Sequence, residues 1–182
     1  VLIGAPGFDG GGLNSGKAYL FFGAILWGGG EIPLESADFE FVGSDPYEEV
    51  GLAAAGAGDM DGDGFGDVVI GAPSNRDRGY HAGKVSLYLG DSLFDGAEVA
   101  DYVFLGEESY ARLGSSFLHA GDVDGDGLAD LWISAPASTS RTGKLYLITG
   151  SMLLSSSVDV IDSPCILSAE SAGDGMGLSF DV

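Results

Sequence analysis

The sequence predicts an all-β chain built from three related units, each with four short antiparallel strands. Three copies of one strand-like element carry this prediction, offset by 67 and then 63 residues: Ile3–Pro6, Ile70–Pro73 and Ile133–Pro136. An apolar run that begins with Gly-Lys follows each copy: Gly16–Gly23, Gly83–Gly90 and Gly143–Gly150. The 32 glycines show no three-residue period, so they exclude a collagen-like chain and favour turn-rich β structure.

The other two strands of each unit flank these elements. An apolar stretch predicts the last strand: Phe39–Gly43, Tyr102–Gly106 and, more weakly, Val160–Leu167. A run of small residues predicts the first strand, which begins at Gly51, Gly114 and Gly177, 63 residues apart. Small side chains fit where backbones crowd together around an axis. Four-stranded units at this period predict the blades of a β-propeller, whereas a β-helix would need shorter repeats and a sandwich would not repeat.

Two acidic loops lie between the first and second strands of their units. In the first loop, four carboxylates stand at relative positions 1, 3, 5 and 9: Asp59, Asp61, Asp63 and Asp67. The backbone carbonyl of Phe65 is a further candidate metal ligand. The second loop repeats the spacing with Asp122, Asp124, Asp126 and Asp130. Alternate residues of a tight loop can point inward, so these oxygens can converge on one point.

Such loops require a cation. Carboxylates about 5 Å apart repel one another by roughly 3 kcal/mol per pair at an effective dielectric constant of about 20. An oxygen-only donor set indicates a hard cation, and six or seven ligands suit Ca²⁺ better than Mg²⁺. The loops differ from EF-hands, because Ile70 and Ile133 stand where a bidentate glutamate is needed. One such loop could be a solvated turn, but two with the same spacing argue against coincidence.

Charge and composition narrow the possible partners. The net charge of −21 disfavours nucleic acid and anionic membranes as partners. No apolar run approaches the ~18 residues of a membrane-spanning helix.

Cys165 is the single cysteine, so no intrachain disulfide is possible. Because the chain opens inside a strand-like run, we expect it to be a piece of a longer polypeptide.

The combined motifs resemble the FG-GAP repeats of the integrin α-subunit β-propeller and its bacterial relatives. The resemblance implies an extracellular or cell-surface adhesion or ligand-recognition module, with two Ca²⁺ sites between first and second strands. It assigns ligands to Asp59, Asp61, Asp63, Phe65 and Asp67, and to Asp122, Asp124, Asp126, Leu128 and Asp130. The sequence departs from the pattern at Ser134, which replaces a glycine, and at Val50, Leu113 and Met176, which replace a phenylalanine.

The repeats also predict the domain boundaries. Residues 1–50 form a blade without its inner strand and calcium loop, 51–113 and 114–176 are complete blades, and 177–182 begin the next blade. We therefore expect about three blades of a larger propeller. In the alternative, Gly177–Val182 complete the first blade, within one chain or between chains. Open blade edges require further blades or another chain at both ends.

A ligand-binding surface is predicted on the face opposite the acidic loops. Its loops contain His81 and six aromatic or basic residues of the kinds found at binding hot spots: Tyr47, Arg76, Arg78, Tyr80, Tyr110 and Arg112. The ligand is expected to be a protein or a glycan. The competing interpretation is that these side chains pack against their own blades.

Catalysis is not predicted. The two histidines, His81 and His119, form no constellation with a nucleophile, and the carboxylates that could act as acid and base belong to the cation loops. The alternative function is an accessory or substrate-binding propeller of a secreted hydrolase.

Overall fold

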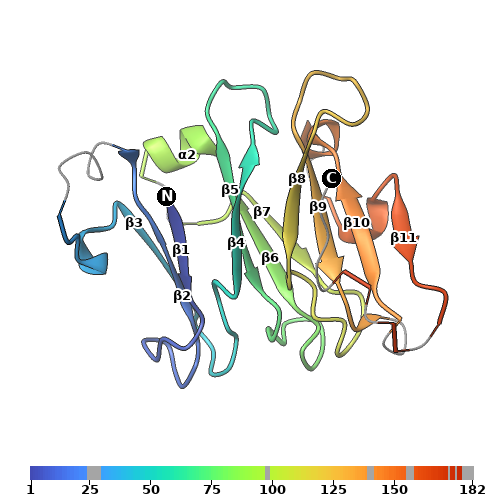
Figure 1. The fold of residues 1–182 in the computed structure, drawn as a ribbon, viewed down its shortest axis with the longest axis horizontal. Helices are drawn as coiled ribbons and strands as arrows, with labels where there is room; N and C mark the ends of the chain where they lie inside the picture. Colours follow the sequence, from blue (N-terminus) through green and yellow to red (C-terminus); the bar gives the residue numbers. More distant parts are fainter. Residues whose placement is uncertain are drawn as a thin grey trace.

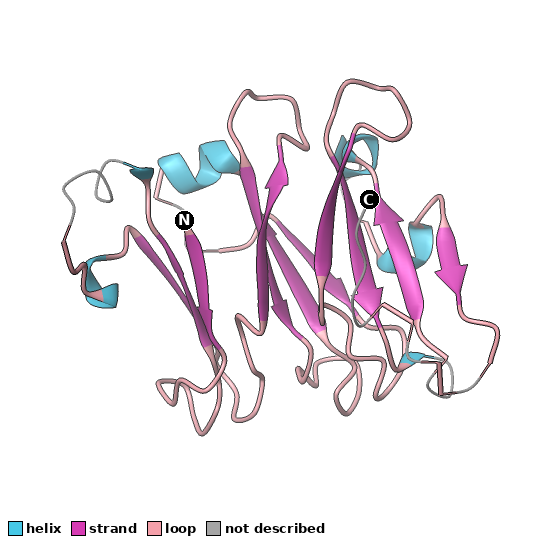
Figure 2. Cartoon of the chain, in the orientation of Figure 1, coloured by secondary structure: helices cyan, strands magenta, loops and turns pink. Residues whose placement is uncertain are grey.

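The computed structural model describes residues 1–23, 30–96, 99–138, 142–154, 158–171, 173–174 and 176–177, and it is all-β (Figures 1 and 2). Three antiparallel sheets stand side by side. The first has the order β1 (Leu2–Ala5), β2 (Lys17–Leu20), β3 (Phe39–Val42). The second has the order β4 (Ala53–Gly58), β5 (Asp67–Ala72), β6 (Lys84–Tyr88), β7 (Tyr102–Leu105), and the third β8 (Phe117–Gly121), β9 (Asp130–Ala135), β10 (Lys144–Ile148), β11 (Ile166–Ser168). The predicted all-β fold of neighbouring propeller blades is confirmed.

The middle sheet packs against its two neighbours through both of its faces. Strand β5 is buried along its whole length, and successive side chains of a strand point to opposite faces. Accordingly, Val69 joins a core with Leu131 and Ile133 of β9 in the third sheet. Its neighbours Val68 and Ile70 join a second core with residues of the first sheet. Because both faces are covered, the strand is a continuous apolar run rather than an alternation of apolar and polar residues.

Glycines permit the closest approach between sheets. A Cβ on Gly71 of β5 would lie 2.1 Å from the carbonyl oxygen of Gly114, which precedes the inner strand of the third sheet. A Cβ on Gly4 of β1 would likewise lie 1.8 Å from the Gly51 oxygen. In β9, Ser134 occupies the equivalent position, and its hydroxyl oxygen accepts a hydrogen bond from Ser116 N at 2.9 Å. The recurring glycine therefore sets the spacing between sheets.

The helical segments were not anticipated from the sequence. They are α2 (Gly90–Phe94) and the 3₁₀ turns η1 (Leu34–Ser36), η2 (Gly150–Leu154) and η3 (Val160–Asp162). The predicted strand Val160–Leu167 is wrong over its first part, because Asp159 caps η3 by accepting a bond from Val160 N at 2.7 Å. The strand β11 begins only after Pro164. The predicted inner strand Gly177–Val182 lies, apart from Gly177, outside the described residues.

A buried ion pair joins the first and second sheets at their lower loops. The Glu48 carboxylate, in the β3–β4 loop, is 1% exposed and lies 2.6 Å from Nζ of Lys84 at the start of β6. It also accepts a bond from Asn75 Nδ2 at 2.8 Å. Burial by itself would raise the pKa of Glu48, but the Lys84 ammonium and the Asn75 amide outweigh it and hold that pKa below its usual value. The network fixes the loops on this face.

Replacing Glu48 by alanine should lower the free energy of unfolding by about 3 kcal/mol, because it removes the buried partner of Lys84 and of the Asn75 amide and leaves the lysine only Asp77, at 3.7 Å. Urea unfolding at neutral pH measures the loss. Arg78→Ala is the control, since it breaks a more exposed ion pair and should cost under about 1 kcal/mol. Equal losses for the two variants would contradict a special role for the buried pair.

The same network predicts a pH dependence. Glutamate titrates at about pH 4.3 in an unfolded chain, and the folded-state pKa of Glu48 is lower. Its contribution to stability is therefore complete above about pH 4.3 and is lost as pH falls through the folded value. The difference in unfolding free energy between the wild type and Glu48→Gln should stay constant at higher pH and narrow below about pH 4.3. A constant gap down to about pH 2.5 would exclude this assignment.

Candidate metal centres

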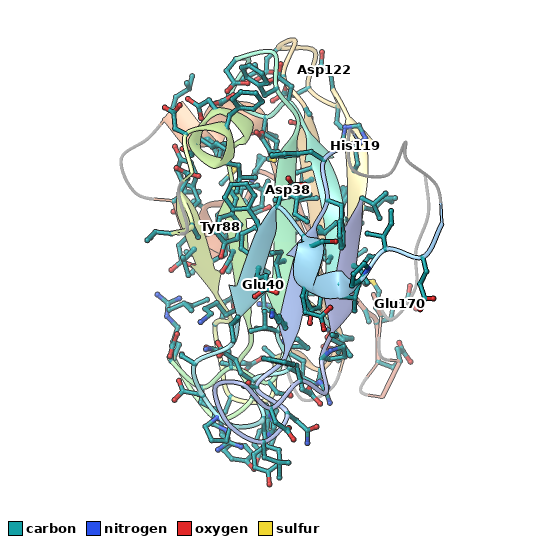
Figure 3. The ribbon with its side chains drawn as sticks, turned by 90° about the vertical axis from the view of Figure 1, so that its left-hand side faces the viewer. Asp38, Glu40, Tyr88, His119, Asp122 and Glu170 are labelled. Carbon is teal, nitrogen blue, oxygen red and sulfur yellow. The ribbon has the colours of Figure 1, made fainter. Side chains whose placement is uncertain are left out.

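The two acidic loops are the β4–β5 and β8–β9 connections, and they lie at the same end of the molecule (Figure 1). Each follows a β-bulge, between Gly56 and Gly58 in one sheet and between His119 and Gly121 in the other. Oxygens of Asp59, Asp61 and Asp63 lie within 4.8 Å of one another. In the second loop the same holds for Asp122, Asp124 and Asp130. Figure 3 shows Asp122 at this end of the molecule, beyond His119.

Each loop holds its shape by turning carboxylates toward its own backbone. The Asp59 carboxylate accepts bonds from Gly62 N at 2.8 Å and Gly64 N at 3.0 Å. The equivalent Asp122 accepts from Gly125 N at 2.7 Å and Gly127 N at 3.0 Å. All four glycines have positive φ angles between 81° and 91°, which glycine adopts without strain. The two loops thus share one conformation.

The last aspartate of each loop serves as a buried clamp. Asp67 accepts bonds from Met60 N at 2.7 Å and from Gly90 N, at the start of α2, at 2.8 Å. Asp130 repeats the arrangement with Val123 N at 2.7 Å and Gly150 N at 3.1 Å. Both side chains therefore tie their loop to the end of the third strand of the same sheet. The sequence pattern showed the carboxylates but not Gly90 and Gly150, which lie 23 and 20 residues along the chain from their partners.

The loops concentrate negative charge. Burial raises the pKa of Asp67 to about 6, and the charges of Asp61 and Asp63 add to the effect, although the two N–H donors oppose it. Burial and neighbouring carboxylates also raise the pKa of Asp61, and one of those neighbours, Asp91 in α2, was not recognised in the sequence. A cation at the loop would relieve this repulsion.

The residues present fit a hard divalent cation. The converging donors are carboxylate oxygens, and no histidine or sulfur ligand belongs to either group. The structure brings three of the four predicted carboxylates of each loop together. Asp67 in the first loop and Asp126 in the second lie outside those tight groups. The carbonyls of Phe65 and Leu128 remain predicted ligands.

The predicted ligand-binding residues lie in loops at the opposite end. Tyr80 and Tyr110 are in contact, with ring centroids 5.4 Å apart, and the Arg76 guanidinium lies 4.6 Å from the Tyr80 ring centre. Arg112 N donates to His81 O at 3.1 Å, which places Arg112 in the same cluster. Arg78 instead pairs with Asp159 at 2.8 Å. Tyr47 lies across a hollow from Arg76, in the β3–β4 loop.

Comparison with known proteins identifies the repeats. The model of the FG-GAP repeat matches residues 51–88 and 114–148, each of which spans an inner strand, an acidic loop and the next two strands. The chain is 31% identical over 127 residues to integrin alpha-8 of Gallus gallus, covering 64% of this chain and 12% of that protein. It is 34% identical over 140 residues to integrin alpha-PS5 of Drosophila melanogaster, covering 76% and 13%.

A further relative is the phosphatidylinositol-glycan-specific phospholipase D of Rattus norvegicus, 32% identical over 164 residues, covering 78% of this chain and 19% of that protein. The chain thus spans between 12% and 19% of the length of these three relatives. Within the described residues, no helix has the length and apolar character needed to cross a membrane.

With Ca²⁺ as the probe, Asp63→Ala should reduce the bound metal from about two ions per chain to about one, because it removes one of three converging carboxylates. Native mass spectrometry with and without a chelator counts the ions. At Ca²⁺ about twentyfold above the dissociation constant, each site should add about 1.8 kcal/mol of stability. Asp95→Ala, an exposed acidic residue outside both loops, is the control. Unchanged stoichiometry in Asp63→Ala would refute the ligand assignment.

Proposed function

Because the chain carries the FG-GAP repeats of an integrin-like propeller, we propose that it is a calcium-stabilised adhesion or ligand-recognition module, extracellular or on the cell surface. The observation that carries the proposal is the pair of matching acidic loops at one end of the molecule, with aromatic and basic side chains in the loops at the other end. In the second and third sheets, the acidic end would serve stability, and the opposite end would be available for recognition. The similarity to integrin α subunits supports the adhesion or ligand-binding role.

Calcium is the cation that best suits the loops. Ca²⁺ takes six to eight oxygen ligands in flexible geometry, whereas Mg²⁺ demands a near-ideal octahedron. Asp59, Asp61 and Asp63 supply the first carboxylates, with Asp67 and the Phe65 carbonyl behind them. Asp122, Asp124, Asp126 and Asp130, with the Leu128 carbonyl, repeat the set. Extracellular modules bind Ca²⁺ at about 10⁻⁴ to 10⁻³ M, so these sites would be filled outside the cell.

Two kinds of partner follow from this arrangement. The ligand, a protein or a glycan, would bind the face opposite the calcium loops, near Arg76, Tyr80, Tyr110 and Arg112. Further blades, or another chain, would cover the open edge of β1, which pairs only with β2 among the described strands. Residues 51–113 and 114–176 would each be one complete blade of the larger ring.

The similarity to a phospholipase D does not favour a catalytic role for these blades. Integrin α subunits match the same chain, so the shared repeats carry no information about catalysis. The acidic groups that could act as acid and base are those that the proposed cations occupy.

The proposal is tested by passing the calcium-loaded chain over an array of purified extracellular-matrix proteins and glycans. At least one probe should retain the chain, and a chelator should weaken retention at least about tenfold because the blades loosen. Asp63→Ala/Asp124→Ala should behave like chelated wild type, and Asp95→Ala like untreated wild type. A folded, calcium-loaded chain that binds nothing would contradict the proposal, and turnover of a phosphatidylinositol-glycan would favour the hydrolase alternative.

A further inference from the structure

The lysine and arginine side chains of the described residues all lie at the end opposite the acidic loops. Lys17, Lys84 and Lys144 are the first residues of β2, β6 and β10, and the arginines lie in the β5–β6 and β7–β8 loops. The lysines are neutralised by Glu40, Glu48 and Glu107 at 2.6 to 2.7 Å. The positive charge left for a partner therefore comes from arginine.

Arg76 is the arginine that is not engaged in an ion pair in the described structure. Arg78 pairs with Asp159 at 2.8 Å, and Arg112 approaches Glu49 at 3.5 Å. The Arg76 side chain is exposed and instead lies over the Tyr80 ring. The chain has 28 acidic and 7 basic side chains, yet this arginine has no carboxylate partner among the described residues. Its guanidinium is therefore available to bind an anionic group of another molecule.

Arg76 belongs to a compact group that we call the aromatic–arginine cluster: Arg76, Tyr80, His81, Tyr110 and Arg112. His81 contacts Tyr80 edge-on at 4.2 Å and Tyr110 at 6.1 Å between ring centroids. Tyr80 is 48% exposed and Tyr110 59% exposed. Nδ1 of His81 is buried without a hydrogen-bond partner. Burial, together with the charges of Arg76 and Arg112, lowers the pKa of His81, so the imidazole is neutral at pH 7.

The chain contains an internal control for this cluster. The loops of the first sheet have the same backbone, with positive φ at Asn14, Tyr47 and Glu49 where the second sheet has it at His81, Tyr110 and Arg112. Tyr47 N donates to Leu13 O at 2.7 Å, as Tyr110 N donates to Tyr80 O at 2.7 Å. The left-handed backbone is therefore a feature of the repeat and requires no basic side chain.

The side chains nevertheless differ at four of the five equivalent positions. The first copy carries Asp9, Leu13, Asn14, Tyr47 and Glu49 where the second carries Arg76, Tyr80, His81, Tyr110 and Arg112. Two acidic side chains on one copy thus correspond to two basic side chains on the other. Since the fold accepts either set, folding alone does not account for the second set.

We propose that the aromatic–arginine cluster binds a carboxylate side chain of an acidic peptide segment in a protein partner. This inference rests on the proposed recognition function and names its ligand class. Arg76 is the main anchor, because a guanidinium binds a carboxylate through two parallel N–H bonds and Glu49 already faces Arg112. Tyr80 and Tyr110 supply the rigid aromatic contact that is common at protein interfaces.

Two observations indicate where the carboxylate binds and why a peptide is favoured over a glycan. The hollow on the Tyr47 side of Arg76 is lined by Asp45, Glu48 and Asp77, so an anion is disfavoured there. On the tyrosine side, Arg112 stands beside Arg76 and offsets the charge of Glu49. A sugar would need a free aromatic face to stack on. One face of Tyr80 is covered by the Arg76 guanidinium, and His81 and Tyr110 contact the same ring, so a peptide fits the cluster better than an acidic glycan.

The test uses the ¹⁵N-labelled, calcium-loaded 182-residue chain and two capped peptides, acetyl-Gly-Glu-Tyr-Glu-Gly-amide and its Glu→Gln counterpart. NMR titration at low salt should show the glutamate peptide binding at least about tenfold more tightly, with shifts centred on Tyr80, His81 and Tyr110. The double variant Arg76→Asp/Tyr80→Leu carries the residues of the first copy and should fold. Its affinity should fall at least about tenfold, whereas Leu13→Ala at the matched position should bind as the wild type does.

Equal binding of the two peptides, or undiminished binding by the double variant, would overturn the proposal. Tighter binding of an oligogalacturonate than of the glutamate peptide would overturn the choice of a peptide. If the double variant keeps its calcium-dependent retention on the array but both peptides fail to bind, recognition stands and the assignment to this cluster fails. If the wild type binds neither array nor peptide, both proposals fail.

Discussion

Close packing of sheet against sheet is the constraint on which the rest of the structure depends. A Cβ on Gly71 would overlap the carbonyl oxygen of Gly114, and one on Gly4 would overlap that of Gly51. Only residues without a large side chain allow backbones to approach in this way. Once the sheets are this close, both faces of β5 lose contact with water, and the two cores on either side of it form. The loops at the two ends of the sheets then acquire fixed positions.

The acidic end uses carboxylates both as structure and as candidate ligands. Asp67 and Asp130 are buried and accept bonds from Gly90 N and Gly150 N, which hold the loops to their sheets. The converging groups are Asp59, Asp61 and Asp63 in the first loop, and Asp122, Asp124 and Asp130 in the second. Burial, together with repulsion from neighbouring carboxylates, raises the pKa values of Asp61 and Asp67, so the negative charge of the first loop is poorly compensated by the protein itself. A hard cation bound at the loop would relieve the repulsion among these carboxylates. In that case the same residues would link metal binding to stability.

At the opposite end, two copies of the repeat keep one backbone conformation under different side chains. Corresponding loops of the first and second sheets share left-handed residues and backbone hydrogen bonds. Their side chains differ in charge, with Asp9 and Glu49 in one copy and Arg76 and Arg112 in the other. The backbone conformation of these loops is thus common to the two copies, and the charge of their side chains varies without changing it.

The sequence by itself determined the all-β class, the strand positions and the acidic loops, because each depends on residues close together in the chain. Spacing alone identified Asp59, Asp61 and Asp63, and the structure groups them. It failed for Val160–Leu167, where the Asp159 cap and Pro164 override apolar composition. Only the tertiary structure decided that Glu48 meets Lys84 and that Arg76 covers Tyr80 beside Tyr110. Glu48 and Lys84, like Tyr80 and Tyr110, come from separate segments of the chain, so only the tertiary fold brings them together. Arg76 and Tyr80 share the β5–β6 loop, and their contact depends on the conformation that this loop takes between its two strands.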